Sequence, residues 1–214
     1  SLKPDITAPG VGIVAARAAG TALGAPVDDY YTRASGTSMA TPHVAGAAAI
    51  LAQRHPDWKA AELKGALTGS ARAYEERSPF EQGTGRVDVA RALNQTLIAT
   101  PSSVSFRSDS ADATPQTRTL ALVNHGSASV TAALDVAVKD KSGRPAPGTV
   151  TVEPTSVTVP AGGSTEVAVT FHPGADTGGQ VSGLLRAVDA VGAELLRVAI
   201  GADQPVIRHK LRLT

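Results

Sequence analysis

The chain has 214 residues, with 20 basic and 19 acidic side chains, a formal charge of +1 and no cysteine. This length accommodates one or two domains, and the balanced charge excludes a nucleic-acid binder, which would carry a basic patch. No apolar run approaches the roughly 20 residues of a membrane span, and the lack of cysteine excludes a disulfide framework and thiolate metal sites.

The beginning of the chain predicts a short strand followed by a long helix. The largely apolar run 11–15 is typical of a buried strand. Residues 41–55 are rich in alanine and carry no charge before Arg54, which predicts a helix that is buried on most of its sides. Pro42 suits the first turn of that helix, where a backbone N–H has no intrahelical partner in any case.

Two further helices are expected before residue 97. Apolar residues recur at helical spacing within 58–70, and Asp57 is the expected N-cap of that helix. A glycine-containing turn at 83–85 precedes a short helix expected over 87–93, with Asp88 near its start. Together these elements predict an α/β segment.

Residues 104–203 predict an all-β domain. Apolar and polar residues alternate over short runs, which are separated by turn-forming Gly, Pro, Asn and Asp. Seven or eight strands at this spacing are typical of a β-sandwich of about 100 residues. The expected strands are 118–123, 130–138, 149–153, 156–159, 164–171, 181–188 and 194–200.

The two halves are expected to be separate domains. We expect a linker over 98–103, where Pro and Ser interrupt the pattern, and a tail or the start of another segment over 204–214. The predicted fold class is therefore α/β for residues 1–97, followed by an all-β sandwich over 104–203.

Ser38 is the candidate catalytic residue. It lies where a glycine-containing segment meets the long helix, near the positive end of the helix dipole. Free backbone N–H groups in a first helical turn can face a developing oxyanion, and Gly36 leaves room beside the hydroxyl. The alternative is that Ser38 or Thr37 only caps the helix, a position that both residue types favour.

A longer motif favours catalysis. Residues 36–46 (Gly-Thr-Ser-Met-Ala-Thr-Pro-His-Val-Ala-Gly) resemble without interruption the nucleophile signature of the subtilisin-like serine proteases, or subtilases, peptidase family S8. Residues 3–10, 55–58 and 83–88 are similar to other segments of that family. The resemblance covers about residues 1–97 and implies the C-terminal portion of an α/β catalytic domain with a mostly parallel sheet. It also implies that Ser38 is the nucleophile and that the Ser38 backbone N–H helps to bind the oxyanion.

No suitable catalytic base for this serine is found in the chain. A nucleophilic serine needs a base, normally histidine, that is oriented by a carboxylate. His43 projects about 140° round the helix from Ser38, and His55 lies about 25 Å along the helix axis. None of the five histidines is a suitable base, and the other three, in or after the sandwich, are His125, His172 and His209.

The order of the triad along the chain accounts for this. In subtilisin the order is Asp, His, Ser, so both partners precede the nucleophile. No histidine precedes Ser38, and the carboxylates that do are Asp5, Asp28 and Asp29, of which Asp5 is expected to be structural. We therefore expect a fragment of an endopeptidase whose catalytic Asp and His, and oxyanion-hole Asn, lie in a missing upstream segment. Such a fragment is inactive alone.

Other features of the sequence are less specific. Tyr31 and Arg33 lead into the nucleophile and are candidates for the rim of the substrate site, with a surface turn as the alternative. Residues 94–96 fit an N-glycosylation sequon. Scattered aspartates show no EF-hand spacing, so we assign no metal site and expect no cofactor. Subtilases often bind calcium, but no calcium site maps onto this chain.

The expected partners are a polypeptide substrate and the missing part of the catalytic domain, with no nucleic acid and no membrane. The resemblance implies a secreted protein. The sandwich resembles the fibronectin type III-like modules of larger extracellular subtilases. Three roles for it stay open: docking to a substrate or a cell wall, buttressing the catalytic domain, and acting as a passive spacer. Two alternatives remain: a non-catalytic binding or spacer protein whose sandwich is the functional part, and an N-terminal nucleophile at Ser1.

Overall fold

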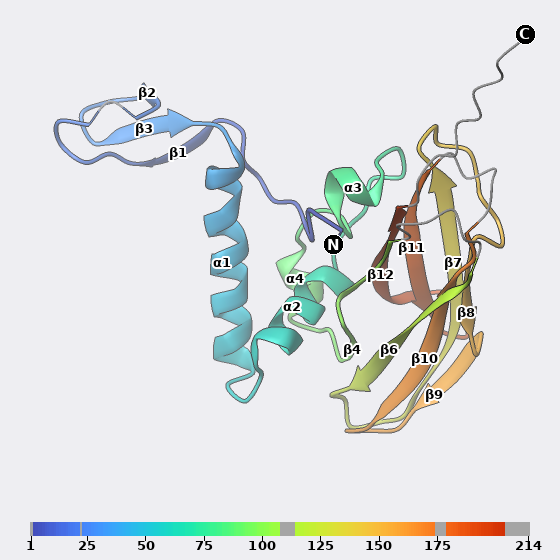
Figure 1. The fold of residues 1–214 in the computed structure, drawn as a ribbon. Coiled ribbons are helices and arrows are strands. Elements are labelled where there is room, and N and C mark those ends of the chain that lie inside the picture. Colours follow the sequence, from blue (N-terminus) through green and yellow to red (C-terminus); the bar gives the residue numbers. More distant parts are fainter. Residues whose placement is uncertain (1, 22, 108–113, 174–178, 204–214) are drawn as a thin grey trace, which may run out of the picture.

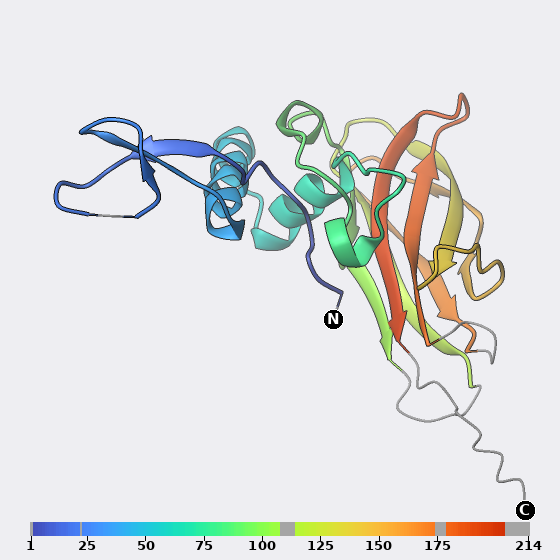
Figure 2. The ribbon, with the colours of Figure 1, turned by 90° about the horizontal axis from the view of Figure 1, so that it is seen from above.

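The structure is a computed structural model that describes residues 2–21, 23–107, 114–173 and 179–203. Three parts follow one another in space: a small β-sheet at one end, helices in the middle and a two-sheet β-sandwich at the other end (Figure 1, Figure 2). The tail expected over 204–214 lies outside the described residues.

Short strands and helices make up the first part of the chain, as expected. Helices and short strands followed by an all-β sandwich confirm the predicted fold class. The strands before residue 97 are β1 (Ile13–Ala16), β2 (Ala25–Pro26) and β3 (Tyr31–Ala34), and the helices are α1 (Thr37–Arg54), α2 (Ala60–Gly69), α3 (Pro79–Gln82) and α4 (Val89–Ala92).

Strands β1, β2 and β3 form an antiparallel sheet, not a parallel one. β3 is central, with Ile13 of β1 opposite Ala34 and Ala25 of β2 opposite Arg33. Parallel pairing needs a long crossover, usually a helix, and no described helix joins β1 to β3. The described residues therefore do not form the mostly parallel sheet that the resemblance implies. Strand β1 is also largely exposed rather than buried.

Helix α1 is longer and more exposed than expected. It begins at Thr37 rather than at residue 41, so that Pro42 lies inside the helix and not in its first turn. Its fully buried residues are Ala47 and Leu51, which belong to a core shared with α2. Because a single stripe of the helix packs against neighbours, the expectation of burial on most sides is wrong for the described residues.

The start of α4 confirms an expectation, and the start of α2 corrects one. The side chain of Asp88 accepts a hydrogen bond from the Arg91 N–H at 3.0 Å and caps α4. The residue before α2 is Lys59, not Asp57. Glu62 in the first turn of α2 accepts a hydrogen bond from the Lys59 N–H at 2.9 Å, so a carboxylate inside the helix satisfies the donor that Asp57 was expected to serve.

The sandwich consists of two sheets. One sheet has the strand order β4-β6-β10-β8 and the other has the order β5-β12-β11-β7-β9. Within the described ladders of these sheets, the pairing of β12 with β5 is parallel and the others are antiparallel. The strands are β4 (Leu97–Thr100), β5 (Ser103–Arg107), β6 (Gln116–Asn124), β7 (Val130–Asp140), β8 (Val150–Glu153), β9 (Ser156–Val159), β10 (Ser164–Phe171), β11 (Gln180–Val188) and β12 (Glu194–Asp203).

All seven strands expected from the sequence are present, and their apolar faces form the core. In β10, for example, Val167, Val169 and Phe171 are buried. Strands β4 and β5 are additional, and they occupy most of the linker expected over 98–103. The linker prediction is wrong because residues 101–102 are only the short connection between two strands.

Strand β4 contributes to two cores. Leu97 and Ala99 lie in the sandwich core, whereas Ile98 between them lies in the core formed with α1, α2 and α4. This division follows from the alternation of side chains along a strand. A Cβ at Gly65 of α2 would come within 2.2 Å of Ile98 Cγ2, so the helix lies directly on the strand. The helices and the sandwich are therefore packed against each other.

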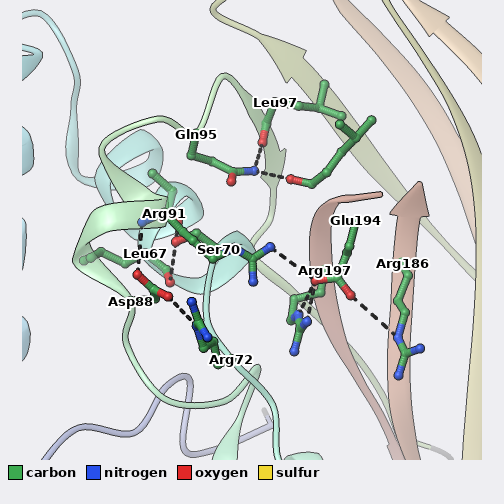
Figure 3. A network of polar contacts seen from close by, with 12 residues as sticks. Leu67, Ser70, Arg72, Asp88, Arg91, Gln95, Leu97, Arg186, Glu194 and Arg197 are labelled. Carbon is green, nitrogen blue, oxygen red and sulfur yellow. Dashed lines mark hydrogen bonds and ion pairs between the residues drawn. The ribbon is translucent and has the colours of Figure 1, made fainter. Parts of the chain in front are cut away.

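A polar network reinforces the same junction (Figure 3). Glu194 of β12 accepts a hydrogen bond from Arg197 Nε at 2.8 Å, and it lies 3.6 Å from Arg91 of α4 and 3.8 Å from Arg186 of β11. The buried amide of Gln95, just before β4, donates to backbone carbonyls in β4 and β12. One carboxylate and one amide thus connect α4 and its exit loop to the sandwich.

Candidate functional site

Ser38 lies in the first turn of α1 and is exposed. Gly36 holds the N-cap position, and the helix has no side-chain hydrogen bond at its cap. Neither Ser38 nor Thr37 therefore caps the helix, so the alternative that one of them serves only as a cap is wrong. Among the described residues, none forms a hydrogen bond with Ser38 Oγ.

A turn that is distant in sequence fixes the loop before Ser38. The Gly36 N–H donates to the Gly10 carbonyl at 2.8 Å, and the Gly12 N–H donates to Ser35 Oγ at 2.8 Å. A Cβ at Gly10 would lie 2.7 Å from the Gly36 carbonyl oxygen and 3.2 Å from Ala40 Cβ. Only glycine allows this approach, so Gly10 sets the position of the loop that presents the hydroxyl.

The backbone around Ser38 favours negative charge beside the hydroxyl. As the second residue of α1, Ser38 has no helical acceptor for its N–H, and it lies at the positive end of the helix dipole. Pro42, four residues later, has no N–H to donate to the Ser38 carbonyl. An exposed hydroxyl beside an unengaged N–H is the arrangement that nucleophilic attack and oxyanion binding require.

No described histidine is hydrogen-bonded to Ser38. His43 Nδ1 contacts the Met39 carbonyl of its own helix at 2.9 Å. His55 follows the last residue of α1, at the end of the helix opposite Ser38. The remaining histidines are His125 and His172 in the sandwich and His209 outside the described residues.

Two of the three upstream carboxylates have other partners. Asp5 forms ion pairs with Lys3 and Lys64. Burial raises the pKa of Asp5, but the two lysines outweigh it and hold the pKa below its usual value. Asp28 accepts hydrogen bonds at 2.8 Å from the backbone N–H groups of Tyr30 and Tyr31 and so forms the turn into β3. Both residues therefore stabilise local structure.

Tyr31 and Arg33 lie in β3, directly before the Ser38 loop. Both are exposed, and as alternate residues of one strand they share a face of the sheet. They remain candidates for the substrate rim. Two hollows at the junction with the sandwich, of ≈ 410 Å³ and ≈ 650 Å³, include neither Ser38 nor β3.

The described part of the chain contains neither a cluster of metal-binding side chains nor a membrane-spanning helix. No group of three or more acidic or histidine side chains is placed there to hold a metal ion. No described helix is long and apolar enough to cross a membrane.

The far end of α1 carries a ring cluster that sequence analysis did not single out. The His55 ring is stacked on Trp58, with centroids 3.9 Å apart and planes at 8°. Trp58 in turn meets His125 of the sandwich at 5.0 Å and 52°. Burial, together with the positive charges of Arg54 and His125, lowers the pKa of His55. No local sequence pattern signals this contact, because its members come from both halves of the chain.

Comparison with known families gives a match to the part of the chain that contains Ser38. Residues 1–85 match the model of the Subtilase family, peptidase S8. This N-terminal part of the chain is therefore similar to the subtilases. The matched region contains the Ser38 loop and the whole of α1, whereas the sandwich lies outside it.

Proteins of Arabidopsis thaliana are similar to just under half of the chain. Subtilisin-like protease SBT1.3 is 37% identical over 114 residues, and subtilisin-like protease SBT1.6 is 41% identical over 115 residues, each match covering 45% of this chain. The chain spans about 15% of the length of either relative.

Two solved structures show likeness over about half of the chain. The ASH / PapD-like domain of human CEP192 is 19% identical, with a TM-score of 0.40 over 53% of this chain and 88% of that chain. A chaperone-tip adhesion subunit complex, CsuC-CsuE, of Acinetobacter baumannii is 14% identical, with a TM-score of 0.40 over 51% of this chain and 52% of that chain.

Proposed function

We propose that the chain is the C-terminal part of a secreted subtilisin-like serine endopeptidase and that Ser38 is its nucleophile. The observation that carries the proposal is the placement of Ser38, whose exposed hydroxyl lies in the first turn of α1 without capping the helix. The catalytic His and Asp come from a segment upstream of Ser1, in keeping with the Asp, His, Ser order of subtilisin. Secretion rests on the family resemblance.

The proposed reaction is acyl transfer from a polypeptide substrate. Ser38 Oγ attacks the scissile carbonyl carbon while the upstream imidazole takes the hydroxyl proton. The tetrahedral intermediate then collapses, the C–N bond breaks, and the amine leaves with that proton. The Ser38 N–H binds the oxyanion, a role worth about 3–4 kcal/mol for a typical donor. Water finally hydrolyses the acyl ester and restores the hydroxyl.

The substrate is expected to lie against β3. Tyr31 and Arg33 share an exposed face of the strand that leads into the Ser38 loop. We propose that they line the leaving-group side, where Tyr31 offers apolar contact and Arg33 a fixed positive charge.

A serine-reactive phosphonate tests the proposal. We expect the isolated 214-residue chain to remain unlabelled, because it lacks a base, and the full-length protein to label stoichiometrically. Ser38→Ala should abolish labelling and peptide hydrolysis in the full-length protein. Ser127→Ala, at an exposed turn of the sandwich, is the matched control and should label normally.

Three outcomes would contradict the proposal. Labelling of Ser38 in the isolated chain would show that no upstream partner is needed. Mapping of the label to Ser1 would favour the N-terminal nucleophile. A full-length protein that neither labels nor cleaves peptides would favour the alternative of a non-catalytic binding or spacer protein with a functional sandwich.

A further inference from the structure

The helix that carries Ser38 is attached to the sandwich at its far end by three rings. His55 is the C-cap residue of α1, Trp58 lies in the corner between α1 and α2, and His125 lies in the turn after β6. The stacking of His55 on Trp58 and the contact of Trp58 with His125 make a continuous path of rings. The His125 N–H donates to the Thr96 carbonyl at 2.8 Å, which fixes the sandwich end of that path.

The stack contains one polar atom without a partner. His55 Nε2 is buried, and no described group forms a hydrogen bond with it. A neutral imidazole tolerates this as an unused acceptor. An imidazolium would instead place an unpaired N–H donor and a positive charge at the same buried position, which is far more costly. Protonation of His55 therefore opposes the stacked arrangement.

The charges around His55 act in the same direction. Arg54 on α1 and His125 beyond the indole both disfavour a positive charge on the His55 ring. Asp57, the carboxylate nearest in sequence, is exposed to solvent. A competing effect is the attraction between an imidazolium and the face of an indole. We infer that the unpaired buried nitrogen and the two cationic neighbours outweigh this attraction.

We propose that His55, Trp58 and His125 form a ring contact between the Ser38 helix and the β-sandwich that breaks in acid. The neutral rings stack and hold the C-terminal end of α1 against the turn after β6. Protonation of His55 expels its ring from the stack and removes this contact between the helix end and the sandwich. The proposal concerns this junction and does not depend on the chemistry of Ser38.

The pH range follows from the lowered pKa of His55. In the unfolded chain, histidine titrates at about 6.5. Between that value and the lower value in the folded protein, the unfolded state binds more protons, so stability increases with pH. The stability that this ring contact contributes is fully present above about pH 6.5 and is lost as the pH falls below that value.

Trp58 is the only tryptophan of the chain, so its fluorescence reports the stack directly. We would record the emission spectrum and acrylamide quenching of the 214-residue chain from about pH 8 to about pH 4, the range over which histidine titrates. We expect a red shift and greater quenching by acrylamide, with a midpoint below about 6.5. Arg54→Gln should raise the midpoint, because it removes a repelling charge from an exposed position.

Two variants assign the transition. His55→Phe keeps a ring on Trp58 but has no titrating group, so its emission should stay blue-shifted and independent of pH. His172→Gln, which alters a histidine that contacts Thr151 at 3.1 Å in the sandwich, should retain the wild-type transition.

Several results would overturn the proposal. A midpoint above about 6.5 would mean that attraction between imidazolium and indole dominates. Dimmer emission in acid without a red shift or increased acrylamide access would mean that the rings stay stacked when charged. A transition that persists in His55→Phe, an unchanged midpoint in Arg54→Gln, or emission that does not depend on pH would each refute the role of His55.

Discussion

Gly10 determines how closely the turn at 8–10 approaches the Ser38 loop. A Cβ at this position would lie 2.7 Å from the Gly36 carbonyl oxygen, and a backbone oxygen cannot rotate away as a side chain can. We expect Gly10→Ala to destabilise the 214-residue chain by about 1–3 kcal/mol in urea unfolding, the usual cost of overpacking. The same change should slow phosphonate labelling of the full-length protein, because it displaces the loop.

Gly46→Ala is the matched control for Gly10→Ala. Gly46 lies on an exposed face of α1, and a Cβ there would meet nothing within 4 Å. Alanine in place of glycine inside a helix is favourable by about 1 kcal/mol, so this variant should be slightly more stable than the wild type. Equal losses of stability in the two variants would show that the contact at Gly10 is not the cause.

Individual residues differ in how well the sequence predicts their roles. Ser38 could be placed at a helix start because its signal is local, with Gly36 just before it and helix-forming alanines just after it. The tie between Gly10 and the Ser38 loop could not be predicted, since it joins two turns that no periodic pattern connects. The contact of Trp58 with His125 could not be predicted for the same reason, because His125 belongs to the other half of the chain.

At the scale of elements, Glu194 couples α4 to strands β11 and β12. Its carboxylate side chain is 19% exposed and interacts with Arg91, Arg186 and Arg197. We expect Glu194→Gln to cost about 1–3 kcal/mol in urea unfolding, because three guanidinium groups lose their shared counter-charge. The loss should shrink at high salt, since two of the three ion pairs are partly solvated.

Glu76→Gln serves as the comparison for Glu194→Gln. Glu76 is exposed in the loop before α3, and a surface substitution of this kind usually changes stability by less than about 0.5 kcal/mol. A similar loss in both variants would indicate a general effect of net charge, and an unchanged stability of Glu194→Gln would mean that the arginines are adequately solvated without the carboxylate.

Periodicity predicts elements well where a face is buried along its whole length. The alternation in β10 located the strand and its inward residues, because every second side chain enters the sandwich core. The same reasoning failed for α1. Its apolar composition suggests packed neighbours on all sides, but the described residues pack against a single stripe of the helix. It also failed for β4, because Pro101 and Ser102 resemble a linker although they join two paired strands.

At the scale of the whole molecule, the helices and the sandwich should unfold as one unit. Leu97 and Ile98 are adjacent residues of β4 that belong to different cores, so neither core can open without disturbing the strand. We expect a single calorimetric transition for the 214-residue chain, with equal calorimetric and van't Hoff enthalpies. Two resolved transitions would show that the cores melt independently.

The exposed sheet of β1, β2 and β3 has a practical consequence for handling the protein. Val14 of β1 is 47% exposed, and Leu23 and Tyr30, in the connections between the strands, are 69% and 75% exposed. In the described pairings β1 is bonded to β3 along one side alone. Free strand edges with apolar faces act as templates for pairing between molecules. Purified chain will therefore self-associate as it is concentrated, and dilute, freshly prepared samples are the right material for spectroscopy and labelling.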